Sequence, residues 1–283
     1  MLLADAHLHS NPVRGLGAVE IARRFRRVGG WFIALVGLSP WHYGFGVPRS
    51  IDGYLKAYET HISECRRARA EGVRVSCLIG FHPADVDRLV SSGLSLDEIL
   101  ILIDEVTNVL RSYCSRGVID GIGEVGRQHY KTMPIRLALA EYAMLKALEV
   151  ARDYDCIVHL HLENEGRATV ATTAKLLGLK KGDRVLFHHA SVSVASAASL
   201  EGYWSSVPGR LEALRKLFSQ GNVEYVVVES DFIDDPRRPC VAQCPWELAR
   251  VFKKLIEENV IGEEDVAKIN IENIVKFYGV IPP

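Results

Sequence analysis

Short apolar runs alternate with amphipathic stretches along the whole chain, and this alternation is what most constrains the fold. The apolar runs are LLADAHLH (2–9), WFIALVGLS (31–39), VRVSCLIGFHP (73–83), VIDGIGEVG (118–126), CIVHLHLE (156–163), RVLFHHAS (184–191) and EYVVVESD (224–231). Nearly continuous apolar runs of this length are typical of strands buried on both faces of a parallel sheet. The amphipathic stretches between them predict helices that cross from one parallel strand to the next.

These patterns predict an α/β fold, a (β/α)8 TIM barrel. Seven strands are evident, and the eighth is expected between His189 and Tyr225, where EGYWSSVPG (201–209) is a weak candidate for strand seven. A barrel without it would be distorted. Barrels of about 250 residues are commonly one domain, so we expect residues 1–283 to form a single domain. The aromatic loop at 39–49 follows the second strand and is expected to cover the mouth of the barrel.

Histidines and carboxylates come at the ends of these runs. His7 and His9 are spaced by two, so their rings point to one side of a strand. Because active sites in such barrels lie at the carboxyl ends of the strands, these side chains should converge. Imidazole and carboxylate groups together indicate a metal site. The converging residues are His7, His9, His82, Glu124, His161, His188 and Asp231.

Composition limits the classes of partner. The net charge is −1 with 48% hydrophobic and 24% charged residues, so no global field attracts nucleic acid or an anionic membrane. Asp5 interrupts the apolar start and no long apolar run exists, so we expect a cytoplasmic protein without a membrane span. No obligate protein partner is evident.

The six cysteines show no arrangement typical of a small disulfide framework. We expect Cys77 and Cys156 to be small core residues. The C-x3-C spacing of Cys240 and Cys244 is only a weak signal for a disulfide or a metal site.

The motifs DAHLH, GFHP, GEVG, VHLH, FHH and VESD, in this order, resemble the TatD-type metal-dependent hydrolases. These are TIM barrels of the amidohydrolase superfamily, known mainly as deoxyribonucleases. The resemblance runs from residue 2 to about residue 278, and HHAS and ESDFIDDPRRP look closer to the archaeal branch than to the bacterial one. Related phosphotriesterases use a modified lysine on strand four, where this chain has Glu124.

The resemblance implies roles for individual residues. It implies a site for two divalent metal ions, with zinc best suited to histidine-rich ligation and Mn, Mg, Co or Ni as alternatives. Glu124 would bridge both ions, and Asp231 would bind one ion and accept a proton from the attacking water. His82 would face the substrate. The implied metal ligands are His7, His9, Glu124, His161, His188 and Asp231.

Three neighbouring residues have less specific expectations. Glu229 lies on the same strand face as Asp231 and can accept the N–H of a ligand histidine. His159 lies one pleat deeper than His161 and is expected in the core or behind the ligands. His189 should point away from His188, towards the helix layer.

The substrate side departs from the bacterial pattern. The arginine that usually follows the strand-five histidine is replaced by Glu163, and GEVG is followed by Arg127 and Gln128. Arg127 and Arg237 come at the predicted mouth and are candidates for binding a phosphate.

Three functions therefore stay open. The first is hydrolysis of a phosphodiester in nucleic acid or a small molecule, as in a TatD-like nuclease. The second is hydrolysis of a C–N or ester bond, as in an amidohydrolase or lactonase. The third is a metal-holding scaffold without activity, which the presence of both Glu124 and Asp231 disfavours.

Overall fold

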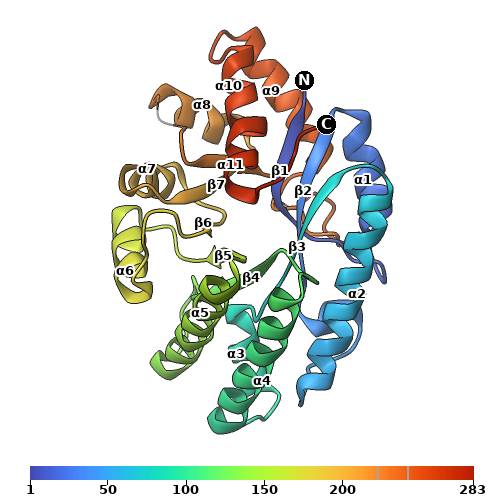
Figure 1. The fold of residues 1–283 in the computed structure, drawn as a ribbon, viewed down its shortest axis with the longest axis vertical. Helices are drawn as coiled ribbons and strands as arrows, with labels where there is room; N and C mark the ends of the chain where they lie inside the picture. Colours follow the sequence, from blue (N-terminus) through green and yellow to red (C-terminus); the bar gives the residue numbers. More distant parts are fainter. Residues whose placement is uncertain (222, 241) are drawn as a thin grey trace.

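A computed structural model describes residues 1–221, 223–240 and 242–283. Eight parallel strands follow one another in chain order around a single sheet, and helices surround them (Figure 1). The strands are β1 (Leu3–Leu8), β2 (Gly30–Val36), β3 (Arg74–Ile79), β4 (Gly121–Gly126), β5 (Ile157–His161), β6 (Val185–Phe187), β7 (Trp204–Pro208) and β8 (Val226–Glu229). The predicted (β/α)8 barrel is confirmed, and the weak seventh strand lies inside the segment proposed for it.

The barrel closes through residues that follow β8 rather than through a long β1–β8 ladder. Leu8 pairs with Phe232 in parallel, and the backbone N–H of Asp231 donates to the carbonyl oxygen of His7 at 3.1 Å. The site residues of the first and last strands are therefore joined through the backbone.

Amphipathic segments form the outer layer, as the sequence predicts. The α-helices are α1 (Gly17–Arg27), α2 (Ile51–Ala70), α3 (Pro83–Ser91), α4 (Leu96–Ser115), α5 (Pro134–Tyr154), α6 (Arg167–Leu177), α7 (Val192–Glu201), α8 (Leu211–Ser219), α9 (Leu248–Glu257), α10 (Glu263–Ala267) and α11 (Asn273–Tyr278). Shorter turns are η1 (Pro40–Tyr43), η2 (Pro245–Glu247) and the π-helical η3 (Lys268–Glu272).

The core has two parts. The larger part lies between the sheet and the helices, where the apolar stripes of the helices are buried. The smaller part fills the barrel interior and includes Ala4, Phe32 and Leu186. Phe277 and Tyr278 of α11 pack into this interior part, so the C-terminal helix closes the amino-terminal end of the barrel (Figure 1).

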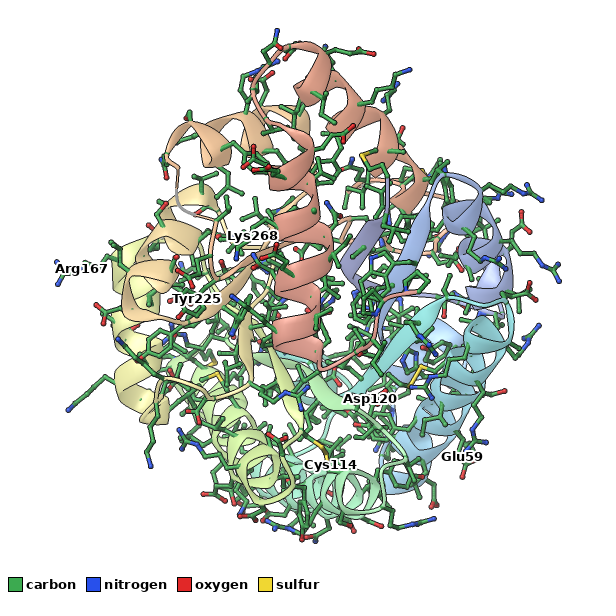
Figure 2. All side chains as sticks on the ribbon, turned by 45° about the horizontal axis from the view of Figure 1, so that its top comes forward. Glu59, Cys114, Asp120, Arg167, Tyr225 and Lys268 are labelled. Atoms are coloured by element: carbon green, nitrogen blue, oxygen red, sulfur yellow. A yellow bond between two sulfur atoms is a disulfide. The ribbon has the colours of Figure 1, made fainter. Side chains whose placement is uncertain are left out.

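Cys77 and Cys156 are buried in the core, as predicted, but the disulfides that the cysteines form were not predicted. Each of the six is paired, in the disulfides Cys65–Cys77, Cys114–Cys156 and Cys240–Cys244. The first joins α2 to β3, and the second joins α4 to the residue before β5. Cys114 of the second disulfide is labelled in Figure 2. Helix–strand packing brings together cysteines that lie 12 and 42 residues apart, and this proximity is not visible in the spacing.

Within the described residues, no helix combines the length and the apolar character needed to span a membrane.

Candidate metal centre

A cavity of about 1160 Å³ opens at the carboxyl ends of the strands. Loop residues that follow the strands form its walls, and the aromatic loop after β2 contributes Trp41 and His42, as expected for a cover. The sequence-predicted residues that line it are His9, His82, Glu124, His161, His188, Asp231 and Arg237. His7 lies beneath them, fully buried.

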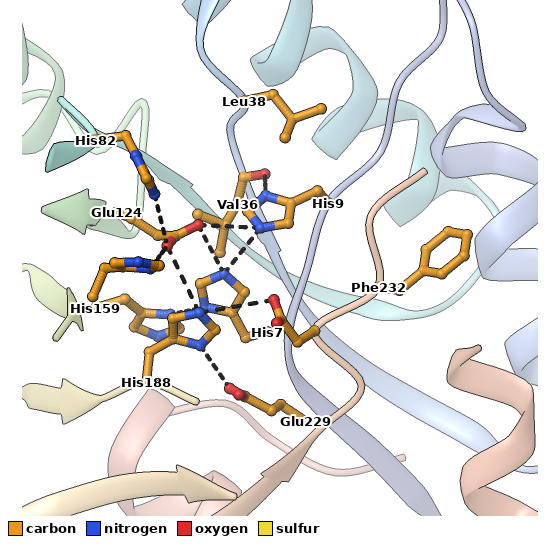
Figure 3. Close-up of polar contacts among 12 residues, drawn as sticks. His7, His9, Val36, Leu38, His82, Glu124, His159, His188, Glu229 and Phe232 are labelled. Atoms are coloured by element: carbon orange, nitrogen blue, oxygen red, sulfur yellow. Dashed lines mark hydrogen bonds and ion pairs between the residues drawn. The ribbon is translucent and has the colours of Figure 1, made fainter. Parts of the chain in front are cut away.

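Glu124 of β4 is the centre of this arrangement, and its two carboxylate oxygens face different histidines (Figure 3). Oε1 lies 3.1 Å from Nε2 of His9 and 3.4 Å from Nε2 of His7. Oε2 faces the other side, where the nearest nitrogens are those of His161 at 2.7 Å, His82 at 3.5 Å and His188 at 3.7 Å. One carboxylate thus connects two groups of imidazoles.

The hydrogen bonds of His9 fix which of its nitrogens can bind a cation. Its Nδ1 lies 2.9 Å from the carbonyl oxygen of Val36, and a carbonyl only accepts, so Nδ1 carries the hydrogen. The neutral ring then presents an Nε2 lone pair to the carboxylate of Glu124. Two lone-pair atoms 3.1 Å apart need a cation between them. The pKa of His9 reflects this: burial alone lowers it, but Glu124 outweighs burial and raises it.

The spacing around Glu124 fits a metal ion in place of that proton. Ligand atoms bound at about 2.0–2.1 Å in a tetrahedral arrangement lie about 3.3–3.4 Å from one another. The Nε2 atoms of His7 and His9 are 3.3 Å apart. With Oε1 of Glu124 they form one compact buried group of possible ligands, and the ring of His161 lies against the other oxygen, with that of His82 nearby. The residues present therefore fit divalent cations.

His188 and Asp231 complete the group from β6 and β8. Nδ1 of His188 lies 2.8 Å from Oε2 of the buried Glu229, the carboxylate contact that orients many metal-binding histidines. The Nε2 atom of His188 lies 3.7 Å from Glu124 and 3.8 Å from Oδ1 of Asp231. Glu229 therefore accepts the N–H of His188, as predicted for a carboxylate beside a possible ligand histidine.

Burial shifts the ionisation of these groups. It lowers the pKa of His7 to about 4, against the opposing effect of Glu124. Burial raises the pKa of Asp231 to about 7, and the charge of Glu124 adds to this rise. Burial would also raise the pKa of Glu124, but the surrounding imidazoles, with His82 and His161 foremost, hold it well below its usual value. Glu124 is therefore the permanent anion of the centre.

His82 is placed to donate rather than to bind a metal. It caps helix α3, and its Nδ1 accepts the backbone N–H of Ala84 at 3.1 Å. The hydrogen of the neutral ring is therefore on Nε2, which points towards Glu124 and the cavity. This tautomer fits the predicted substrate-facing role.

Arg127 corrects a prediction. Its guanidinium is turned away from the cavity and forms a two-pronged ion pair with Glu163, together with a hydrogen bond to Thr173 at 2.8 Å. The strand order places Glu163 beside Arg127, so two departures from the family pattern satisfy each other. Arg237 does line the cavity, at its rim, where it is largely exposed and paired with Asp235.

The prediction that His189 points towards the helix layer is wrong. His189 lines the cavity instead. β6 ends at Phe187, and the backbone of His189 has φ +41°, so the alternation of a strand no longer applies there.

Several cavity residues were not singled out by sequence reasoning. Arg14 and Arg88 lie on the β1–α1 loop and α3, and His129 lies in the β4–α5 loop. Arg14 and His129 follow strand ends, as many loop residues do, and Arg88 lies in a helix, so no sequence pattern distinguished them. The guanidinium of Arg88 lies 5.5 Å from the ring centre of Trp41, so the cavity wall combines aromatic and cationic groups.

The fold and this ligand set define a metal-dependent hydrolase of the TIM-barrel type. A family model described as TatD related DNase matches residues 4–279. The chain belongs to this family.

Known proteins of similar sequence or similar fold span nearly the whole chain. The uncharacterized protein MJ1127 of Methanocaldococcus jannaschii is 29% identical over 282 residues, covering 98% of this chain and 95% of that protein. The fold is similar to the TatD homologue YJJV of Escherichia coli K12, with TM-score 0.66 and 16% identity over 99% of this chain and 98% of that one. It is also similar to the organophosphorus hydrolase of Deinococcus radiodurans, with TM-score 0.65 and 14% identity over 98% and 92%.

Proposed function

We propose that the protein hydrolyses phosphodiesters, with DNA or a nucleotide as substrate, by means of two divalent ions, most suitably zinc. The observation that carries this proposal is the position of Glu124, whose two oxygens each face a separate set of histidines. When bound, the pair of ions would polarise a substrate oxygen and lower the pKa of an attacking water to near 7.

The protein's own groups would then handle protons and position the substrate. Asp231 lies at the cavity, with Oδ1 3.8 Å from Nε2 of His188, and its carboxylate would accept the proton of the attacking water. The Nε2–H of His82 would donate to a substrate oxygen. Glu229 would hold the ring of His188 in place through its Nδ1–H.

The cavity supports an anionic substrate larger than one small metabolite. Its volume of about 1160 Å³ is above the range of roughly 300–1,000 Å³ that small-molecule sites have. The cationic groups on its walls are Arg14, Arg88, Arg237 and Arg238. Trp41 offers a flat surface beside Arg88 on which a nucleobase would stack.

A second candidate is hydrolysis of an ester or amide bond by the same centre. The Arg127–Glu163 pair favours it, because this pair removes one predicted phosphate-binding cation from the cavity. A substrate with less negative charge would not need that cation.

A panel of substrates distinguishes the two candidates. Protein loaded with Zn²⁺, Mn²⁺ or Mg²⁺ would be assayed on bis-p-nitrophenyl phosphate, single-stranded DNA, p-nitrophenyl esters, lactones and amides. We expect kcat/KM to be highest for a phosphodiester and to disappear on chelation. Preference for esters or lactones would support the second candidate, and no turnover of any substrate by loaded protein would refute hydrolysis.

The cytoplasmic location stays a prediction. Disulfides are typical of oxidising compartments, but they also occur in intracellular proteins of hyperthermophiles. With three disulfides, a cytoplasmic location fits the latter case. Cell fractionation with an antibody to the protein tests it.

A further inference from the structure

A chain of hydrogen bonds runs through the barrel interior from the C-terminal helix to the metal centre. The hydroxyl oxygen of Tyr278 in α11 lies 2.8 Å from the carbonyl oxygen of Ala6 and 3.1 Å from Nε2 of His159. The other ring nitrogen of His159, Nδ1, lies 3.0 Å from Nδ1 of His7. Tyr278, His159 and His7 are all buried, so water does not compete for these bonds.

The carbonyl group of Ala6, at one end of this series of hydrogen bonds, fixes which group donates in each bond. Tyr278 has one hydroxyl hydrogen, and the carbonyl of Ala6 can only accept it. The Nε2 of His159 must therefore donate to the hydroxyl oxygen. A neutral imidazole has one N–H, so Nδ1 of His159 is a lone pair and Nδ1 of His7 donates to it. The remaining nitrogen of His7, Nε2, is then a lone pair facing Glu124 and His9.

The neutral state of His159 follows from its surroundings. The ring is fully buried, and no carboxylate among the described residues shares a hydrogen bond with it. A buried imidazolium without an anionic partner would cost several kcal/mol, on the order of the desolvation penalty of an ion. A cation at this position would also reverse the donor direction and put a hydrogen on the nitrogen of His7 that faces Glu124.

Packing alone does not account for the tyrosine hydroxyl. The ring of Tyr278 packs against Phe32 and Phe277, with ring centres 4.5 and 4.8 Å away. A phenylalanine would fill the same space. The hydroxyl is needed only for the two polar contacts, and the one with His159 leads on to His7 in the metal centre.

We propose that Tyr278 and His159 are positioning residues that hold His7 in the tautomer able to bind a metal ion. The C-terminal helix thereby supports the centre from the opposite end of the barrel. This inference rests on the metal-binding part of the proposed function and does not depend on hydrolysis. Partners of this kind behind a ligand typically change metal affinity by about 10–100-fold.

The variant Tyr278→Phe tests the chain, and Tyr203→Phe is its matched control. Tyr203 also donates its hydroxyl to a backbone carbonyl, that of Leu179, but outside the centre. Zn²⁺ affinity would be measured by competition with a chromophoric chelator. We expect Tyr278→Phe to bind the tightest ion about 10–100-fold more weakly and Tyr203→Phe to bind it as the wild type does.

Two further measurements separate positioning from general structural damage. Ring ¹⁵N spectra of the metal-free protein, with His7 assigned by its loss in His7→Gln, should show the proton of His7 on Nδ1 in the wild type and on both nitrogens in exchange in Tyr278→Phe. His159→Asn keeps an acceptor near Nδ1 of His7 and should retain more affinity than His159→Leu.

Equal Zn²⁺ affinity in Tyr278→Phe and Tyr203→Phe would overturn the inference, whatever the activity. A selective loss of affinity in Tyr278→Phe would support it, even if the loaded wild type hydrolyses no substrate in the panel and the proposed hydrolysis fails.

Discussion

The Nε2 atom of His9 lies 3.1 Å from the Oε1 atom of Glu124, although both atoms present lone pairs. The carbonyl of Val36 keeps the hydrogen of His9 on the opposite nitrogen. The pair is stable only with a cation between the two atoms, and the same carboxylate faces His161 on its other side. Glu124 therefore connects the two halves of the centre, and the first prediction follows from this position.

Glu124→Ala should reduce the binding of both ions, because each oxygen of this carboxylate serves a different group of histidines. His161→Ala is the comparison, since it removes a ligand from one group only and should leave one ion bound. The metal content of purified variants, measured by plasma mass spectrometry, checks both. Two ions per chain retained by Glu124→Ala would rule out the bridging role.

Asp231→Asn should abolish turnover more completely than metal binding. An amide oxygen still contacts a metal, but an amide cannot accept the proton of the attacking water, and such proton transfer contributes typically 10²–10⁴-fold. We expect kcat to fall by a factor in that range, while the protein keeps most of its bound metal. Turnover would be measured on the best substrate of the panel. Near-normal turnover with both ions bound would show that another group is the base.

Arg127→Ala should lower stability without changing KM. Its guanidinium loses the ion pair with Glu163 and the bond to Thr173, and hydrogen bonds to charged groups contribute about 1.5–3 kcal/mol. The double variant with Glu163→Gln should lose less than the sum of the single variants, because the two residues satisfy each other. Urea unfolding measures both effects.

Arg237→Ala is the counterpart at the rim of the cavity. This arginine is exposed, so its loss should leave stability nearly unchanged and raise KM for a phosphodiester. If Arg127→Ala raised KM and left stability unchanged, Arg127 would be a substrate-binding residue and this prediction would be wrong.

The Asp85 carboxyl should make stability depend on pH. Burial raises its pKa from 3.8 to about 6, despite hydrogen bonds from Ser39 and Tyr54. Between these two values the folded state keeps a proton that the unfolded state loses, so this group lowers stability as the pH rises from about 4 to about 6, and the deficit persists above that. Asp85→Asn removes the titration. Its stability relative to the wild type should increase by on the order of 2–3 kcal/mol between pH 4 and pH 7.

Urea unfolding of both proteins at intervals across this range checks the slope. The loss of one acceptor in asparagine shifts all values by a similar amount, so the slope is the informative quantity. A difference that stays flat with pH would contradict the buried, proton-holding carboxyl.

The sequence determined the barrel and the set of histidines and carboxylates that meet at its mouth. Apolar runs such as CIVHLHLE are too continuous for half-exposed strands, and their alternation with amphipathic segments allows few other folds. A parallel barrel brings all carboxyl ends of its strands to one mouth, so His7, Glu124 and Asp231 had to meet there once the strands were recognised. Local pattern and topology were sufficient for this part.

Only the tertiary structure decided which way side chains turn once the strands have ended. His189 does not follow the alternation of the strand, because its backbone has a positive φ. Arg127 forms an ion pair with the neighbouring Glu163 and does not line the cavity. The pairing of Cys65 with Cys77 and the contact of Tyr278 with His159 depend on which helix packs against which strand. These outcomes depend on contacts between residues that are distant in the sequence. The hydrophobic periodicity of a segment predicts only which face of that helix or strand is buried.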